Sequence, residues 1–84
     1  MTKFNTINRP VAITALGFGR DMRVTPRRIE FDGSSYTFVD EGIRARIQRG
    51  SVISQVLTMS DGERMFRLKN DGMGGNWTLL GISQ

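Results

Sequence analysis

The chain has 84 residues and contains neither cysteine nor histidine. Without cysteine there is no disulfide, no thiolate nucleophile and no thiolate metal site. Without histidine the chain lacks the usual proton carrier near neutral pH and the commonest ligand of transition metals. Catalysis would have to depend on carboxylates, hydroxyls, lysine or arginine, so we predict a protein that is not an enzyme.

Long apolar runs are also missing. The most apolar stretch, residues 11–18, is far shorter than the ~20 residues that a transmembrane helix needs. Residues 1–9 do not lead into the apolar segment that a secretory signal requires. We therefore expect a soluble, cytoplasmic protein with no membrane partner.

Proline is scarce, with two residues, whereas glycine is abundant, with ten that separate short apolar runs. This distribution is typical of short strands joined by tight turns rather than of a helix bundle. At this length the chain forms one domain with a modest core. We predict a single domain over residues 1–84, with residues 1–9 as a loosely held, flexible arm.

Residues 27–38 give the clearest structural signal, a β-hairpin that turns at Asp32-Gly33. Glycine accepts the positive φ that tight hairpin turns require. The loop closes either on these two residues or on four residues, 32–35. Because side chains alternate along a strand, both registers place the same four residues on one face: Ile29, Phe31, Tyr36 and Phe38.

A second hairpin is predicted from residues 52–59 and 64–69, joined at Asp61-Gly62. A turn on these two residues pairs Leu57 with Phe66 and Gln55 with Leu68. Residues 70–76 are too rich in glycine for regular structure, and they lead into a strand that begins at Trp77. A bulge near Leu79-Leu80 would explain why apolar residues lie on both faces of that strand.

Two further segments, residues 10–16 and 43–48, are strand candidates. In the second, isoleucine and alanine alternate with Arg44, Arg46 and Gln48, although a short helix fits the same residues. The fold class is therefore all-β, an antiparallel barrel or roll of five to six short strands, since a curled sheet protects its edges. Its predicted core is Ile29, Phe31, Tyr36, Phe38, Leu57, Phe66, Leu68, Trp77 and Leu79.

The strongest candidate site is an excess of arginine in the first 50 residues, which hold nine basic and five acidic residues, whereas residues 51–84 hold three of each. Arginine binds phosphate through two parallel hydrogen bonds and stacks on flat rings. If residues 43–48 lie beside the first hairpin, Arg28, Arg44 and Arg46 share one outer face. The alternative is a solvated outer surface, since charged outward positions are the default on a sheet. The candidate nucleic-acid-binding residues are Arg20, Arg23, Arg27, Arg28, Arg44, Arg46 and Arg49.

Other motifs favour turns or core packing over a site. The aromatic residues of the strands resemble stacking platforms for bases, but their spacing places them on the core faces. Residues 72–76 lack the Lys-Ser/Thr of a phosphate-binding loop, and Gly17-Phe18-Gly19 lacks a third glycine. Asp40-Glu41 is adjacent in sequence and is interpreted as turn chemistry. We predict no catalytic residue, no cofactor and no metal.

The order Pro26-Arg27-Arg28-Ile29, Gly33, Tyr36, Phe38, then Phe66-Arg67-Leu68 and Trp77-Thr78-Leu79 resembles short bacterial families of unknown function. In these families an arginine-rich, aromatic hairpin precedes a closing hairpin that ends in a strand with tryptophan. The resemblance covers about residues 26–82 and implies no particular activity.

The sequence thus predicts a basic, non-enzymatic interaction module that binds RNA, DNA or another polyanion through its arginines. The alternative is a module for protein interaction or self-assembly. That hypothesis depends on an apolar outer patch formed by Val56, Met65, Leu80 and Ile82.

Overall fold

Seven strands make up the fold in a computed structural model that describes residues 3–18, 24–71 and 76–83. They are β1 (Phe4–Phe18), β2 (Val24–Phe31), β3 (Ser34–Thr37), β4 (Ile43–Arg49), β5 (Val52–Ser60), β6 (Met65–Asp71) and β7 (Trp77–Ser83). Within these ranges no helix is long and apolar enough to cross a membrane.

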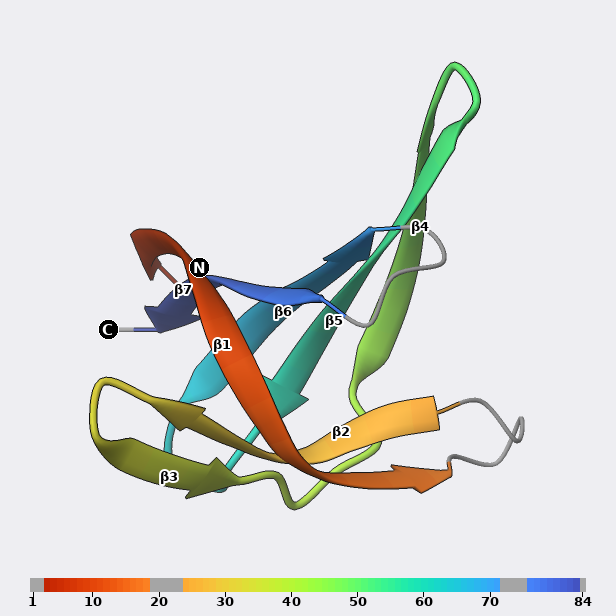
Figure 1. Ribbon diagram of the computed structural model, residues 1–84. Coiled ribbons are helices and arrows are strands. Elements are labelled where there is room, and N and C mark those ends of the chain that lie inside the picture. Colours follow the sequence, from red (N-terminus) through yellow and green to blue (C-terminus); the bar gives the residue numbers. More distant parts are fainter. Residues whose placement is uncertain (1–2, 19–23, 72–75, 84) are drawn as a thin grey trace.

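All neighbouring strands are antiparallel and form one sheet in the order β3-β2-β1-β7-β6-β5-β4. The all-β prediction is therefore confirmed, with seven strands instead of five or six. The sheet is strongly curved (Figure 1), but its end strands β3 and β4 do not pair with each other. It is not closed into a barrel, and the finer description as a roll stays a prediction.

The first hairpin has the two-residue turn at Asp32-Gly33. Asp32 and Gly33 both have positive φ, 54° and 80°, as the tightest hairpin turn requires. Ile29 lies opposite Tyr36, so the shorter of the two predicted registers is the one observed.

The second hairpin has a different register from the predicted one. Leu57 lies opposite Leu68, and Met59 opposite Phe66, because the loop contains four residues, 61–64, instead of two. The Asp61 carboxylate accepts the backbone N–H groups of two of these, Glu63 and Arg64, and this side-chain cap stabilises the longer loop. Since the register moves by two residues, every side chain stays on its predicted face.

Within the predicted arm, residues 4–9 belong to a strand and are not loosely held. Residues 4–9 begin β1, where Phe4 pairs with Ser83 of β7 and the Arg67 guanidinium lies 4.2 Å from the centre of the Phe4 ring. The alternation rule did not reveal this segment because its side chains are mostly polar. β1 pairs with β7 through its first half and with β2 through its second half, with a register shift around Asn8 that bends it.

The C-terminal strand contains the predicted bulge. Arg67 lies opposite Gly81 and Leu68 opposite Leu79, so Leu80 is the extra residue between them. Asn70, which was predicted to lie in a loop, belongs to β6. Residues 72–75 of that predicted loop lie outside the described residues.

The core contains the predicted residues and two fully buried ones that the sequence analysis missed, Met59 and Pro26. Fully buried are Ile29, Phe38, Leu57, Met59, Phe66, Leu68 and Leu79. Of these Met59 was not predicted, and Phe31, Tyr36 and Trp77 are only partly buried. The Phe66 ring lies 4.9 Å from Tyr36 and 5.3 Å from Phe38, so the first hairpin packs on β6 across the concave side.

The segment that follows β3 joins the two ends of the curved sheet. Val39 N–H donates to Ser60 O at 2.8 Å, and the Asp40 carboxylate accepts Ser60 N–H at 3.0 Å. The Arg27 guanidinium donates to the carbonyl oxygens of Phe38 and Asp40. These contacts bring the end of β5 close to β2, and they give Asp40 a structural role between distant segments; the interpretation of Asp40-Glu41 as turn chemistry stays a prediction.

Candidate functional site

One row of side chains crosses the concave face from β1 to β4. Its members lie directly opposite one another on five neighbouring strands, in the order Val11, Trp77, Asn70, Gln55 and Arg46. We call this set the groove row. Four steps between strands of about 4.8 Å give it a contour of about 19 Å.

The neighbouring row on the same face is apolar. Leu57, Leu68 and Leu79, which we call the core row, lie two residues from the groove row on β5, β6 and β7 and are fully buried. Because side chains alternate with period 2, both rows point to the concave side. Residues Gln55 and Asn70 therefore occupy positions where strand alternation predicts apolar core residues.

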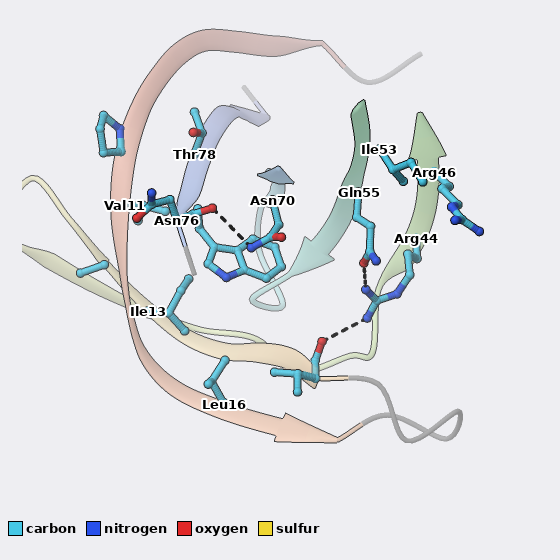
Figure 2. A pocket seen from close by; sticks show the side chains of 14 residues that line it. Val11, Ile13, Leu16, Arg44, Arg46, Ile53, Gln55, Asn70, Asn76 and Thr78 are labelled. Carbon is cyan, nitrogen blue, oxygen red and sulfur yellow. Dashed lines mark hydrogen bonds between the residues drawn. The ribbon is translucent and has the colours of Figure 1, made fainter. Parts of the chain in front are cut away.

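The groove row forms the floor of a groove of about 1280 Å³ that lies between β1 on one side and β4 with β5 on the other (Figure 2). Ile13 and Leu16 project into it from the curved strand β1. Among the described residues that line it, none is Asp or Glu. Besides those already named, the lining residues are Pro10, Ala12, Val24, Arg44, Ile53, Asn76 and Thr78.

Arg44 connects the two sides of this groove. Its guanidinium donates to the Gln55 amide oxygen on β5 and, through Nη2, to Val24 O at 3.2 Å and Thr25 Oγ1 at 3.5 Å on β2. Since β4 and β2 lie near opposite ends of the strand order, this side chain spans the opening that backbone pairing leaves.

Arg46 lies next to Arg44 on the same face and is exposed. Within the described part of the chain its guanidinium has no hydrogen-bond or ion-pair partner. A free guanidinium on a wall without carboxylates provides five N–H donors for phosphate or base oxygens.

The structure separates the predicted arginines. Arg44 and Arg46 lie on the concave face, whereas Arg28 is exposed on the other face, where it donates to Thr14 Oγ1 at 3.0 Å. The expected shared outer face is therefore wrong, because β4 pairs with β5 and not with the first hairpin. Arg27 is half-buried and bound to backbone carbonyls, and Arg49 lies exposed at the end of β4. Arg20 and Arg23 lie outside the described residues.

The aromatic residues divide between core and groove. Phe38 and Phe66 are fully buried, in agreement with the prediction of core packing. Trp77, the single tryptophan, is half-buried and lines the groove, so part of its ring surface is accessible to a ligand. An accessible indole in the same groove as guanidinium groups is suited to the stacking of unpaired bases.

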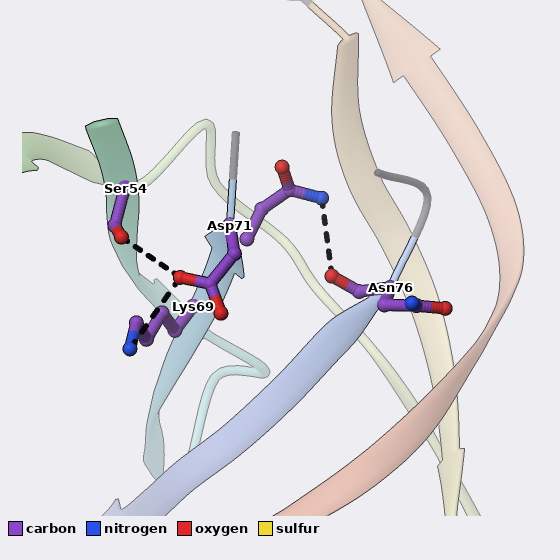
Figure 3. A network of polar contacts seen from close by, with 5 residues as sticks. Ser54, Lys69, Asp71 and Asn76 are labelled. Atoms are coloured by element: carbon purple, nitrogen blue, oxygen red, sulfur yellow. Dashed lines mark hydrogen bonds and ion pairs between the residues drawn. The ribbon is translucent and has the colours of Figure 1, made fainter. Parts of the chain in front are cut away.

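The convex face carries a small polar network (Figure 3). Ser54 Oγ donates to Asp71 Oδ1 at 2.8 Å, and Lys69 Nζ lies 3.4 Å from the same oxygen. The hydrogen bond from Ser54, with the positive charge of Lys69, lowers the pKa of Asp71 below its ordinary value. Ser54 therefore donates its proton to a weak base, so this cluster stabilises the β5–β6 pair and does not activate a nucleophile.

No group of three or more acidic side chains that would hold a metal ion occurs among the described residues. A guanidinium, an indole and amides can bind and stack. They supply no nucleophile or general base near neutral pH.

Comparison with known proteins adds no relative: no family model, no curated protein and no solved structure matches the chain. The resemblance to short bacterial families therefore stays a prediction.

Sequence reasoning missed Gln55 and Asn70 as site residues. A signal was present, since both are polar residues at inward positions of strands whose other inward residues are apolar. Exposed arginines attract attention by their charge, whereas a polar residue on an apolar face is recognised only when the facing of the strand is known.

Proposed function

We propose that this protein is a non-enzymatic, cytoplasmic nucleic-acid-binding module that holds an unpaired strand in the concave groove. The observation that supports it most is the groove row, in which a guanidinium, two amides and an indole occupy inward positions next to a fully buried apolar row. Inward positions beside a buried apolar row usually carry apolar side chains, so polar groups there point to a role other than packing. Their presence in one aligned row favours a ligand.

The dimensions favour an extended ligand over a small molecule. A groove of about 1280 Å³ exceeds the roughly 300–1,000 Å³ of ordinary small-molecule sites. Its contour of about 19 Å corresponds to about five to six nucleotides at the roughly 3.4 Å spacing of a stacked strand. The half-open roll that the sequence suggests would keep such a groove accessible along its length.

The chemistry favours an unpaired strand. Trp77 and the amides of Gln55 and Asn70 lie on the floor of the groove, where only bases that are free of a duplex can reach them. Arg46 and the lack of Asp or Glu among the described lining residues favour phosphate.

Fewer arginines should contribute to nucleic-acid affinity than the number in the sequence suggests. Arg46 is the proposed phosphate contact, and Arg44 positions Gln55. Arg27 is engaged with backbone carbonyls and Arg28 faces away from the groove, so we expect neither to contribute much to affinity.

The test is a fluorescence-anisotropy titration with labelled single-stranded RNA, single-stranded DNA and duplex DNA at two salt concentrations. Arg46→Glu should abolish most binding and reduce the slope of log K against log salt by roughly 0.7, the value for one phosphate contact on a single strand. Arg64→Glu is the matched control, because Arg64 is exposed in the loop between β5 and β6 and the charge change is identical.

Trp77 provides a second readout, since it is the only tryptophan and lines the groove. Stacking of a base on its ring should quench its fluorescence in wild type and in Arg64→Glu. Binding without quenching would contradict the proposed groove, and an equal loss of affinity in both arginine variants would reduce the effect to net charge.

Self-association through β4 is the second candidate. Ile43 and Ile47 are 72% and 43% exposed on this edge strand, and hairpin β4–β5 extends beyond the rest of the sheet (Figure 1). The patch first expected at Val56, Met65, Leu80 and Ile82 is half-buried and favours this function less. A mass above that of the monomer in sedimentation, restored to monomer by Ile43→Lys, would support it.

A further inference from the structure

The amide of Gln55 has a defined orientation. A guanidinium carries only donors, so the Gln55 atom that faces the Arg44 Nη1 group is the amide oxygen. The amide nitrogen, with its two N–H groups, has no partner among the described residues. Gln55 therefore lines the groove with both N–H donors, whereas one lone pair of its oxygen is engaged by Arg44.

The orientation is held from the other end of the sheet. Arg44 also donates to Val24 O and Thr25 Oγ1, which fixes its guanidinium on the side away from Gln55. Turning the Gln55 amide by half a rotation would place N–H against N–H at Arg44. The contacts across the opening thus determine which hydrogen-bonding group Gln55 presents.

This orientation decides which bases the groove can pair with. A free glutamine recognises adenine with both amide atoms, because its oxygen accepts from the adenine amino group and its nitrogen donates to N7. Arg44 competes with the adenine amino group for the Gln55 oxygen and so weakens the first of these contacts. Arg46, the other free polar group on this wall, also offers only donors, and an arginine fork matches the O6 and N7 acceptors of guanine.

The side chain of Asn70 is engaged within the protein, so the inference is drawn from Gln55 and not from Asn70. Asn70 Nδ2 donates to Asn76 O at 3.3 Å (Figure 3). Asn76 also lines the groove, but no described residue fixes its amide, so it favours neither kind of base.

We propose that the groove selects bases with a carbonyl at purine position 6 or pyrimidine position 4, as in guanine and uracil, over bases with an amino group at that position, as in adenine and cytosine. Gln55 is the specificity-determining residue, and Arg44 is the positioning residue that acts through it. The inference rests on the proposed nucleic-acid function and names the substrate class of the same groove.

The test compares two matched pairs of labelled six-nucleotide RNAs, inosine with adenosine and uridine with cytidine. Within each pair the ring size is the same and the main exchange is a carbonyl for an amino group. One hydrogen bond gained or lost should give a ratio of affinities of about three- to tenfold in favour of the carbonyl base. Comparing ratios within pairs removes the difference in stacking between purines and pyrimidines.

Two variants locate the origin of the ratio. Gln55→Glu keeps the contact with Arg44 as an ion pair but offers only acceptors, so both ratios should fall below one even if total affinity decreases. Arg44→Ala releases the amide, so both ratios should fall towards one while binding to adenosine improves relative to inosine. Arg64→Ala should leave both ratios unchanged.

Three results of these titrations would overturn the proposed base preference. Ratios near one in wild type, with binding intact, would overturn the inference and leave the proposed function standing. A ratio above three that persists in Gln55→Glu would also overturn it, because the selectivity would then come from other residues. If none of the four RNAs binds, the proposed function fails and the inference fails with it.

Discussion

The core row and the groove row share one sheet, one face and three strands, yet they differ completely in chemistry. The core row, Leu57, Leu68 and Leu79, is fully buried beneath the first hairpin. Two residues further along each strand, the groove row carries an amide on β5, an amide on β6 and an indole on β7. The backbone pairing continues through both rows without interruption at that point.

Strand pairing and side-chain burial are therefore separate requirements for a stable sheet. The backbone hydrogen bonds between strands form with almost any side chain. An apolar row is needed only where another layer covers the sheet and excludes water. The hairpin of β2 and β3 covers the core row, and no described segment covers the groove row in the same way. The groove row is therefore free to carry the chemistry of a ligand site.

The largest expected effect comes from exchanging a core-row residue and a groove-row residue on β5. Leu57→Gln should lower the free energy of unfolding by about 3–5 kcal/mol, because it leaves a cavity and buries an amide without partners. Gln55→Leu, the reverse change two residues away, should alter it by no more than about 1 kcal/mol, since the lost hydrogen bond is partly solvated. Urea denaturation measures both.

The same experiment has a clear contrary result. If Gln55→Leu destabilises the protein as much as Leu57→Gln does, the groove row belongs to the core and the polar residues are required for folding. The proposed site would then lose its main support.

A second, smaller effect compares the two glycines that flank β4. Gly42 and Gly50 both have positive φ, 73° and 62°, but a Cβ at Gly42 would lie 2.7 Å from Thr58 O and close to the Met59 side chain in the core. Gly42→Ala should therefore destabilise by about 2–3 kcal/mol, from backbone strain and displaced core atoms. Gly50→Ala, which meets nothing within 4 Å, should cost about 1 kcal/mol from strain alone.

Thermal unfolding of the two glycine variants provides the measurement. Equal decreases in melting temperature would mean that the end of β4 at Gly42 is no more tightly packed than the end at Gly50.

The smallest expected effect is a pH dependence at the groove end of β5 and β6. The pKa of Asp71 is lowered by the hydrogen bond from Ser54. Ser54 and Asp71 form the strand pair next to Gln55 and Asn70, and their side chains lie on the opposite face of the sheet. A lowered folded-state pKa contributes stability above the ordinary value of 3.8, and that contribution is lost as the pH falls through the folded-state value. Below about pH 4 the backbone amides near Asp71 should exchange faster.

Hydrogen exchange between pH 3 and 5, corrected for the intrinsic rate, measures this change, and Asp71→Asn should remove it. Because Asp71 is exposed, amides of the core row should show no matching change. A uniform change along β5 and β6 would count against a local role.

Much of the fold could be predicted from local sequence. The Asp32-Gly33 turn, the shared face of the first hairpin and the bulge at Leu80 follow from φ preferences and from the period of 2. The register of the second hairpin could not be predicted in this way, because the Asp61 carboxylate caps a four-residue loop and Asp-Gly alone does not reveal that contact. β1 escaped prediction for residues 4–9, where pairing with β7 stabilises a polar segment that has no strand pattern of its own.

The candidate site was predictable only in part. The sequence identified Arg44 and Arg46 as residues of interest, but it placed them on an outer face beside Arg28. It assigned Trp77 to the core and overlooked Gln55 and Asn70.

The amino-acid sequence by itself determined the all-β class, the positions of the tight turns and the two faces of each hairpin, since these depend on neighbours a few residues apart. Only the tertiary structure decided that β4 pairs with β5 at the far end from the first hairpin. That placement turns Arg44 and Arg46 towards the concave side, next to Gln55. The physical reason is that the facing of an edge strand depends on which strand it pairs with, and strand pairing is a property of the whole chain.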